Sequence, residues 1–308
     1  MSSWKLSAFA PKPLVQDALL AHDEIEDWDF EVVLSGREVA EDRPNDWVLE
    51  AWYSHKPSKA EVGTIAALFA GKAPEIDVDK LPEQDWLVLS QQGVEPIRAG
   101  RFYVHTPEFE PDPDATSFAI PASQAFGTGQ HETTAGCLDM LDAMKRSGVV
   151  TRNIADIGTG TGLLAFAALA LWPRALATAS DIDPACTGVV EDNTALNSMS
   201  MGAAAGQLTM VVADGMDDPL LQARGPYDLL IANILAGPLV ELAADFGKAV
   251  TPGGNLLLAG LLETQEARVR RAYRRAGFRL ARHIVNGDWS ILWLRRRAHK
   301  LPRRARGW

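Results

Sequence analysis

The sequence predicts an α/β protein with two domains, a small N-terminal α+β domain and a larger domain built on a parallel sheet. Strand-like and helix-like stretches alternate through the first 90 residues, and an acidic, proline-rich stretch interrupts the apolar pattern at residues 106–114. Beyond it, apolar runs of strand length alternate with helical stretches. That alternation is typical of a doubly wound parallel sheet with helices on both faces.

The first domain is expected to have the order strand-helix-strand-strand-helix-strand. Strands are expected at residues 4–9, 29–34 and 47–53 and near 86–89, and helices at residues 11–21 and 58–70. Alternating apolar residues indicate the strands, and apolar residues at helical spacing indicate the helices. This order suggests a ferredoxin-like module, a fold that assigns no activity by itself.

A linker is expected between the two domains. Residues 106–114 contain three prolines, four acidic residues and a single large apolar side chain, Phe109. This composition favours a semi-rigid, extended segment over a packed element. We therefore expect a recognition domain over residues 1–105, a linker over residues 106–118 and a ligand-binding domain over residues 119–308.

The acidic residues are concentrated in the first third of the chain. Residues 1–110 carry 21 Asp and Glu against 10 Lys and Arg, the remaining residues carry 19 against 20, and the net charge is −10. An acidic surface attracts cations and repels phosphate backbones. The first domain is therefore expected to present either a plain solvated surface or a docking surface for a basic partner, and its charge argues against nucleic acid as its ligand.

The cysteine and hydropathy patterns exclude other classes of protein. Cys137 and Cys186 are too few for a disulfide framework or a Cys-rich metal site, so no metal is expected. No window approaches the roughly 18 uninterrupted apolar residues of a membrane span, and residues 1–5 show no signal-peptide core. We therefore expect a cytoplasmic protein without a membrane partner.

The chain is organised around a glycine-rich turn. Residues 154–162 read I-A-D-I-G-T-G-T-G, and an unbroken Ala/Leu-rich stretch follows at residues 163–171, which predicts a buried strand that turns sharply into a helix. Such a turn admits a ligand because glycines carry no Cβ and the helix start offers unpaired N–H groups. The dinucleotide fingerprint needs a third glycine where this chain has Leu163.

The spacing instead resembles motif I of the S-adenosylmethionine (AdoMet) methyltransferases, an acidic residue followed by G-x-G-x-G. The resemblance implies that Asp156, Gly158 and Gly160 bind this cofactor, with Asp156 near its amino-acid end. A second strand, expected at residues 176–180, ends at Asp181. A carboxylate at that position can accept hydrogen bonds from both ribose hydroxyl groups, which strengthens the AdoMet interpretation.

Three further motifs resemble one family of these enzymes. They are A-F-G-T-G-Q-H-E-T-T at residues 125–134, N-I-L-A-G-P-L at residues 233–239 and G-G-N-L-L-L-A-G-L-L at residues 253–262. They are similar to motifs of the PrmA family, the bacterial methyltransferases of large-subunit ribosomal protein L eleven (L11). Gln130 and Glu132 depart from the pattern, since the family usually has Thr and Pro there, and their effect on the loop is left open.

This resemblance implies the fold, the cofactor and the activity. It implies a Rossmann-like methyltransferase domain preceded by a smaller ferredoxin-like domain, with Thr134, Gly158, Asp181 and Asn233 binding AdoMet. It also implies an enzyme that methylates lysine side-chain and N-terminal amines of its protein partner, ribosomal protein L11. The alternatives are a methyltransferase of the same core that acts on another protein, RNA or a small molecule, and a non-catalytic AdoMet-binding ribosome factor.

Asn233 is the candidate catalytic residue. It follows a strand expected at residues 227–232, and the carboxyl ends of parallel strands face the ligand crevice. Its amide oxygen can accept a hydrogen bond from the acceptor amine, and the alternative role is a cap on the next helix. His131 and Asp214 are weaker candidates for pocket contacts, with a loop and a turn as their alternative roles.

The chain ends in a basic segment. Residues 295–308 contain eight Lys, Arg or His residues. This composition predicts a disordered basic end, with contact to ribosomal RNA as the alternative. No other stable contact with nucleic acid is expected.

Overall fold

The computed structural model describes residues 4–22, 25, 28, 32–40, 43–71, 73–80, 95–121 and 130–298, without the side chains of residues 130 and 131. The chain divides into two compact units. The first comprises Met1–Gly93 and Ala122–His131, and the second comprises Val94–Pro121 and Glu132–Trp308. Each unit has its own sheet and its own core, so each is described by itself.

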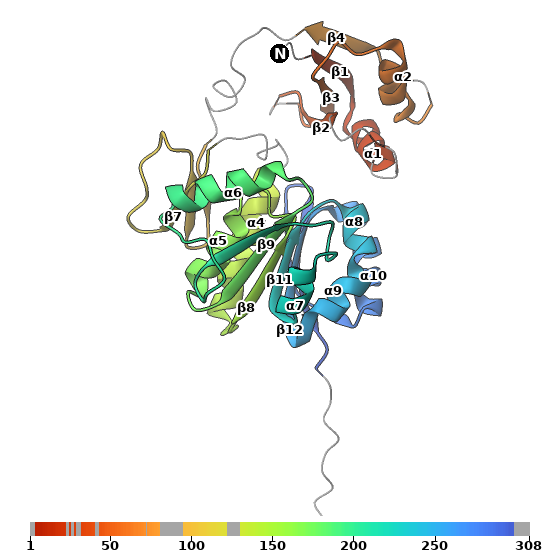
Figure 1. Ribbon diagram of the computed structural model, residues 1–308. Helices are drawn as coiled ribbons and strands as arrows, with labels where there is room; N and C mark the ends of the chain where they lie inside the picture. Colours follow the sequence, from red (N-terminus) through yellow and green to blue (C-terminus); the bar gives the residue numbers. More distant parts are fainter. Residues whose placement is uncertain are drawn as a thin grey trace, which may run out of the picture. The chain divides into compact units, whose positions relative to one another are not determined.

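The first unit has the predicted ferredoxin-like arrangement (Figure 1). Its elements are β1 (Trp4–Pro11), α1 (Lys12–His22), β2 (Val33–Glu38), β3 (Asp46–Tyr53), α2 (Lys59–Ala67) and β4 (Ile76–Lys80). The sheet is antiparallel in the order β2-β3-β1-β4. Alternate residues such as Leu6, Leu49 and Ala51 form a core with Val15 of α1 and Ile65 of α2. The expected order of elements is therefore confirmed.

Two strands of this unit differ from the expectation. Strand β2 runs from Val33 and continues through Gly36, and residues 29–31 of the expected strand lie outside the described residues. A Cβ at Gly36 would lie 2.8 Å from Val15 Cγ1, so this glycine lets α1 pack onto the strand and does not end it. The fourth strand is Ile76–Lys80, which pairs with β1, and the strand expected near residues 86–89 lies outside the described residues.

The second unit is built on a seven-stranded sheet in the order β10-β9-β8-β11-β12-β14-β13. Its strands are β8 (Asn153–Ile157), β9 (Leu176–Asp181), β10 (Leu208–Val212), β11 (Tyr227–Asn233), β12 (Val250–Leu262), β13 (Phe278–Asn286) and β14 (Trp289–Arg296). The first five strands in this order pair in parallel, and β14 is antiparallel to β12 and to β13. The chain order reverses between β8 and β11, the position where doubly wound sheets bind ligands.

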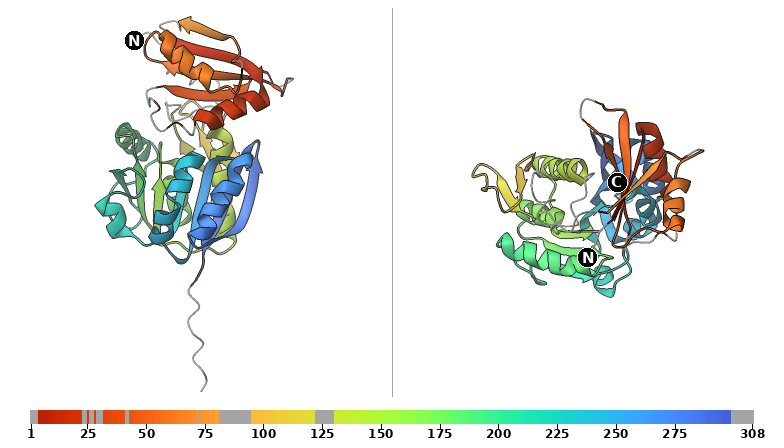
Figure 2. Two further views of the ribbon diagram at one scale, coloured as in Figure 1. Left: turned by 90° about the vertical axis from the view of Figure 1, so that its right-hand side faces the viewer. Right: turned by 90° about the horizontal axis from the view of Figure 1, so that it is seen from above.

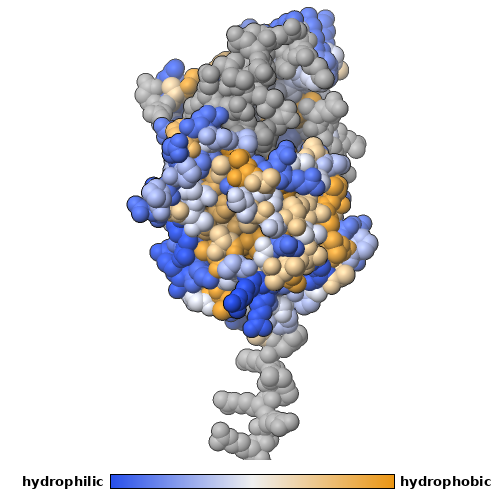
Figure 3. All heavy atoms as spheres, turned by 60° about the vertical axis from the view of Figure 1, so that its left-hand side comes forward, coloured by the Kyte–Doolittle hydropathy of each residue, from blue (hydrophilic) through white to orange (hydrophobic). Residues whose placement is uncertain are grey.

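Helices cover both faces of this sheet. They are α4 (Gln130–Arg146), α5 (Leu163–Leu171), α6 (Ala185–Leu196), α7 (Pro219–Arg224), α8 (Ala236–Glu241), α9 (Ala243–Ala249) and α10 (Glu266–Arg275), with a short 3-10 helix, η1 (Glu263–Gln265). Figures 1 and 2 show α4 to α6 on one side and α8 to α10 on the other. On the surface shown in Figure 3, apolar residues lie among hydrophilic ones, which is normal for a folded protein. None of the described helices is long and apolar enough to cross a bilayer.

The predicted linker is part of the second unit. A small sheet is formed by β5 (Ile97–Ala99), β6 (Phe102–His105) and β7 (Thr116–Ala119). Strand β6 pairs in parallel with β7, and residues 106–115 connect the two. Asp112 forms an ion pair with Arg98. The side chain of Asn197, directly after α6, both donates to Ala119 O and accepts from Ala119 N at 2.8 Å. The expected boundaries at residues 105 and 118 therefore lie inside this unit, which begins at Val94.

The basic end also starts later than expected. Arg295 and Arg296 belong to β14, where Arg296 donates to Val250 O. The structure describes the chain as far as Ala298. Residues 299–308 of the expected disordered end lie outside the described residues.

We predict that a fragment of residues 95–308 unfolds cooperatively and is more stable than a fragment of residues 119–308. The shorter fragment lacks Phe102, Val104 and Phe118, which are 0%, 3% and 5% exposed, and the Phe118 ring lies 6.3 Å from Phe166 of α5. Burial of each side chain is worth roughly 1.5–3 kcal/mol, so urea denaturation should show a loss of more than about 4 kcal/mol. Equal stability would restore the linker interpretation.

Candidate functional site

The turn after β8 has the backbone that its glycines allow. Gly158, Gly160 and Gly162 have φ of 70°, 55° and 84°, values that residues with a Cβ rarely adopt. The N–H groups of Gly158 and Thr159 donate to Ser180 O on β9, at 2.8 and 2.9 Å. The turn is therefore held against the neighbouring strand, and α5 starts directly after it.

Asp156 lies on β8 underneath this turn. It is 1% exposed, and its Oδ2 accepts hydrogen bonds from Thr159 Oγ1 at 2.7 Å and from Ala165 N at 3.1 Å. Burial raises the pKa of this carboxyl to about 7, against the lowering effect of these two hydrogen bonds. Asp156 thus joins the start of the turn to the first part of α5, and its predicted contact with the cofactor stays a prediction.

Asp181 ends β9 and lies beside the turn. Its Oδ2 accepts from Gly160 N at 2.9 Å, and its Oδ1 accepts from Asp183 N at 3.1 Å. Two residues expected to bind one cofactor, Gly160 and Asp181, are therefore in direct contact. Asp183 accepts from Ala185 N at 2.8 Å, which places it at the start of α6.

Asn233 ends β11 at the same edge of the sheet. Its Nδ2 donates to Thr133 Oγ1 of α4 at 3.4 Å, and no described residue donates to its Oδ1. The N-cap position of α8 is Leu235, which makes no side-chain cap hydrogen bond. Asn233 therefore does not cap this helix.

The first turn of α4 reaches this edge as well. Thr134 is 8% exposed and follows Thr133, the partner of Asn233. Glu132 is exposed, and its backbone oxygen accepts from Asn286 Nδ2 at 2.9 Å. The loop at residues 125–129 and the side chains of Gln130 and His131 lie outside the description, so their expected contributions stay predictions.

Sequence reasoning missed Ile234, the residue after Asn233. A Cβ on Gly158 would lie 2.2 Å from Ile234 Cγ2, and a Cβ on Gly260 would lie 2.3 Å from Ile234 O. Ile234 therefore fits between Gly158 in the turn after β8 and Gly260 on β12, which constrains the path of the backbone beside Asn233. The glycines at positions 158 and 260 were visible in the sequence, but their common neighbour was not.

Sequence reasoning also missed exposed apolar residues at this edge. Ile182 after β9, Val212 at the end of β10 and Leu235 after β11 are 63%, 45% and 49% exposed. Their position directly at the ends of buried strands is the sequence signal that could have identified them.

Asp214 is exposed, and its backbone oxygen accepts from Asp217 N, which fits the turn alternative. Among the residues that the structure describes, no group of three His, Cys, Asp or Glu could hold a metal ion.

The raised pKa of Asp156 predicts a pH-dependent contribution to stability. Between about pH 4 and pH 7 the folded chain keeps a proton that the unfolded chain has released, so stability falls as the pH rises through this range. The free energy of unfolding of the wild type, minus that of Asp156→Asn, should fall by up to about 4 kcal/mol from pH 4 to pH 7 and be constant above.

Urea denaturation at several pH values measures this difference. Asp192→Asn, at an exposed position on α6, is the matched control and should give a flat difference. A flat difference for Asp156→Asn as well would contradict the assignment of a buried, proton-binding carboxyl.

Comparisons with known proteins agree with this geometry. The family model described as "Ribosomal protein L11 methyltransferase (PrmA)" matches residues 17–297. A protein of that name from Agrobacterium fabrum is 36% identical over 270 residues, which is 86% of this chain and 90% of the relative. One from Rhizobium leguminosarum is 42% identical over 219 residues, or 70% of this chain and 73% of the relative.

A solved structure gives the same result. The ribosomal protein L11 methylase of Lactobacillus delbrueckii subsp. bulgaricus superimposes with a TM-score of 0.55 at 25% identity, covering 66% of this chain and 98% of that chain. The predicted family, the α/β methyltransferase fold and the AdoMet cofactor are confirmed. The chain belongs to the ribosomal protein L11 methyltransferase (PrmA) family of AdoMet-dependent methyltransferases.

Proposed function

We propose that this protein transfers methyl groups from AdoMet to lysine side-chain and N-terminal amines of ribosomal protein L11. The observation that carries the proposal is the family match over residues 17–297. The edge of the sheet where Gly160, Asp181 and Asn233 lie supports it, because the groups needed to hold a nucleoside and to orient an amine occur there together.

The residues at this edge fit AdoMet. The Asp181 carboxylate suits the ribose hydroxyl groups, and the Cβ-free turn at Gly158 lets a ligand approach the backbone. The exposed Ile182 side chain offers an apolar surface to an aromatic base. A positively charged cofactor would favour the ionised form of Asp156. When bound, AdoMet supplies a methyl group on a sulfonium for in-line displacement by a nucleophile.

The acceptor amine has to be neutral before it can attack. For a lysine of pKa about 10.4, deprotonation at pH 7 costs roughly 4–5 kcal/mol, and for an α-amine of pKa near 8 it costs about 1.4 kcal/mol. Loss of water and a neighbouring positive charge both disfavour the ammonium form. The Oδ1 of Asn233, to which no described residue donates, would accept an amine N–H and turn the nitrogen lone pair toward the methyl group, so no dedicated base is needed.

The first unit is proposed to recognise the protein substrate. Its sequence carries most of the acidic excess, and negative charge attracts a basic protein and repels RNA. The proline-rich residues 106–114 join two paired strands of the second unit, so they are not proposed as a hinge between the units. A ribosomal protein substrate also supports a cytoplasmic location.

We predict that Asn233→Ala lowers kcat for methylation of isolated L11 about 10- to 100-fold, because one hydrogen bond to the reacting amine is lost. Incubation with methyl-labelled AdoMet followed by mass mapping of L11 measures both the rate and the acceptors. Asn233→Asp keeps an acceptor oxygen at the same position and should retain more activity than the alanine variant.

Two outcomes would contradict the proposal. Label in RNA or in no macromolecule would contradict L11 as the substrate. Wild-type kcat for Asn233→Ala would exclude the orienting role of Asn233 and leave the substrate assignment intact.

A further inference from the structure

The C-terminal part of the second unit concentrates positive charge. Residues 266–298, which comprise α10, β13 and β14, contain ten arginines, no lysine and two acidic residues, Glu266 and Asp288. The sequence of residues 111–308 as a whole is close to neutral, so this charge is segregated within it. We call the surface formed by these three elements the arginine face.

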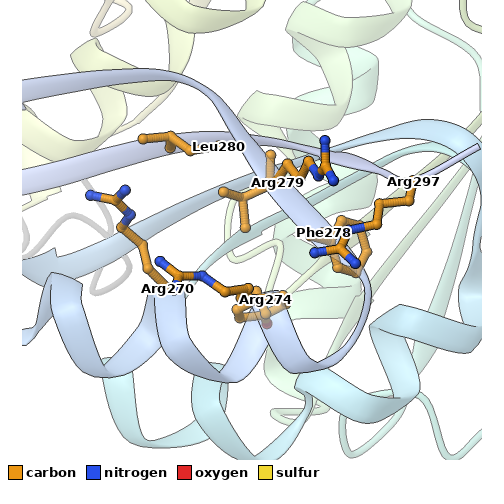
Figure 4. Close-up of a pocket in the computed structure, with 8 residues that line it drawn as sticks. Arg270, Arg274, Phe278, Arg279, Leu280 and Arg297 are labelled. Atoms are coloured by element: carbon orange, nitrogen blue, oxygen red, sulfur yellow. The ribbon is translucent and has the colours of Figure 1, made fainter.

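A hollow of about 200 Å³ lies in the arginine face. Four arginines line it together with apolar and aromatic residues, namely Arg270, Arg274, Arg279, Arg297, Tyr273, Phe278, Leu280 and Leu294. Figure 4 shows the arginine side chains around this hollow, coming from α10, from β13 and from the residue after β14. Four positive groups, from α10, from β13 and from the residue after β14, thus line one space.

Most of this charge is not neutralised within the described part of the chain. Arg270 donates to Glu266 Oε1 at 2.8 Å, whereas no described acidic residue pairs with Arg274, Arg279 or Arg297. Arginine cannot lose its proton in a protein, so the repulsion between these groups persists. The negative end of α10 favours Arg274 in its last turn, but it does not account for Arg279 and Arg297 on the hairpin.

The strand register separates the arginine face from the edge of the sheet where Gly160, Asp181 and Asn233 lie, which we call the cofactor edge. Asn233 pairs with Ala259 at one end of β11 and β12, and Leu229 pairs with Asn255 toward the other end. Arg295 pairs with Asn255 and with Arg279. Arg279 therefore lies toward the amino ends of the parallel strands, at the end of the sheet opposite to Asn233. It is too far along the strands to take part in methyl transfer at Asn233.

We infer that the arginine face binds the phosphate backbone of RNA. Guanidinium groups bind phosphate with paired, parallel hydrogen bonds, and a surface with arginine and no lysine suits that geometry. Exposed Arg268, Arg271 and Arg275 on α10 extend the charge beyond the hollow, as an extended polyanion requires. The choice of RNA among polyanions rests on the proposed function, because RNA is the polyanion that accompanies a ribosomal protein.

The test compares two double variants of the full chain. Arg274→Gln with Arg279→Gln removes two unpaired charges at the hollow, and Arg152→Gln with Arg174→Gln removes two exposed arginines elsewhere in the unit. Binding of fluorescein-labelled oligo(U) RNA is measured by anisotropy at several salt concentrations. Residues 299–308 are unchanged in both variants, so a difference between them reports the arginine face alone.

The first variant should bind oligo(U) at least about tenfold more weakly than the wild type, and the slope of log K against log salt should fall in magnitude by about 1.4, or 0.7 for each lost phosphate contact. The control variant should bind like the wild type. Equal affinities of the two variants would overturn the inference, and so would displacement of the RNA by polyglutamate at equal charge.

Methylation of isolated L11 by the same proteins separates the two proposals. Both variants should methylate L11 at the wild-type rate, because neither changes the cofactor edge. Loss of RNA binding with normal methylation supports the arginine face as a second functional surface. Absence of methylation by the wild type, with RNA binding lost only in the first variant, would overturn the proposed function and leave the RNA-binding face in place.

Discussion

The hydrogen bonds from Thr159 and Ala165 to the buried Asp156 carboxylate hold the cofactor edge together. Burial of a carboxyl group costs free energy of folding unless the group is protonated or hydrogen-bonded. The folded chain therefore needs the turn in the conformation that supplies these hydrogen bonds. The closed turn presents Gly160 to Asp181. It also brings Gly158 against Ile234, and the backbone that carries Asn233 is held from the other side by Gly260. The turn held by Asp156 thus contacts residues at the ends of β9 and β11 as well as β8.

The sign of the charge in each part of the chain matches the partner that we propose for that part. The first third of the sequence is acidic, and residues 266–298 are rich in arginine. An acidic surface suits a basic protein and excludes RNA, whereas an arginine surface suits the phosphate backbone of RNA. Segregation of the two signs within one chain is consistent with an enzyme that works on one component of a ribonucleoprotein and also holds the other.

Much of the second unit could be predicted because its signals are local. Helix α5 runs over Leu163–Leu171 as expected, since an unbroken apolar run after Gly162 leaves few alternatives. Asp181 and Asn233 were placed correctly at one edge because the carboxyl ends of parallel strands always meet there. The ferredoxin-like order of the first unit followed from the same local patterns.

The remaining features depend on packing between distant segments. From the sequence alone, Gly36 predicts the end of a strand. Its actual role, which is to make room for Val15 of α1, depends on a contact between distant segments. Residues 106–114 predict a linker because segments rich in proline and acidic residues rarely form packed elements. Only the pairing of β6 with β7 shows that these residues connect two neighbouring strands. Ile234 and the hollow among Arg274, Arg279 and Arg297 have no local signature, because each is created by elements that meet only in the folded chain.

The most direct measurement of the central claim is a crystal structure of the protein with bound AdoMet. The ribose hydroxyl groups should lie within hydrogen-bonding distance of the Asp181 carboxylate, the backbone of Gly158 should lie beside the amino-acid end, and the Asn233 amide oxygen should face the methyl carbon. A cofactor bound away from the ends of β8 and β9, or an Asn233 amide directed away from the methyl group, would contradict the account.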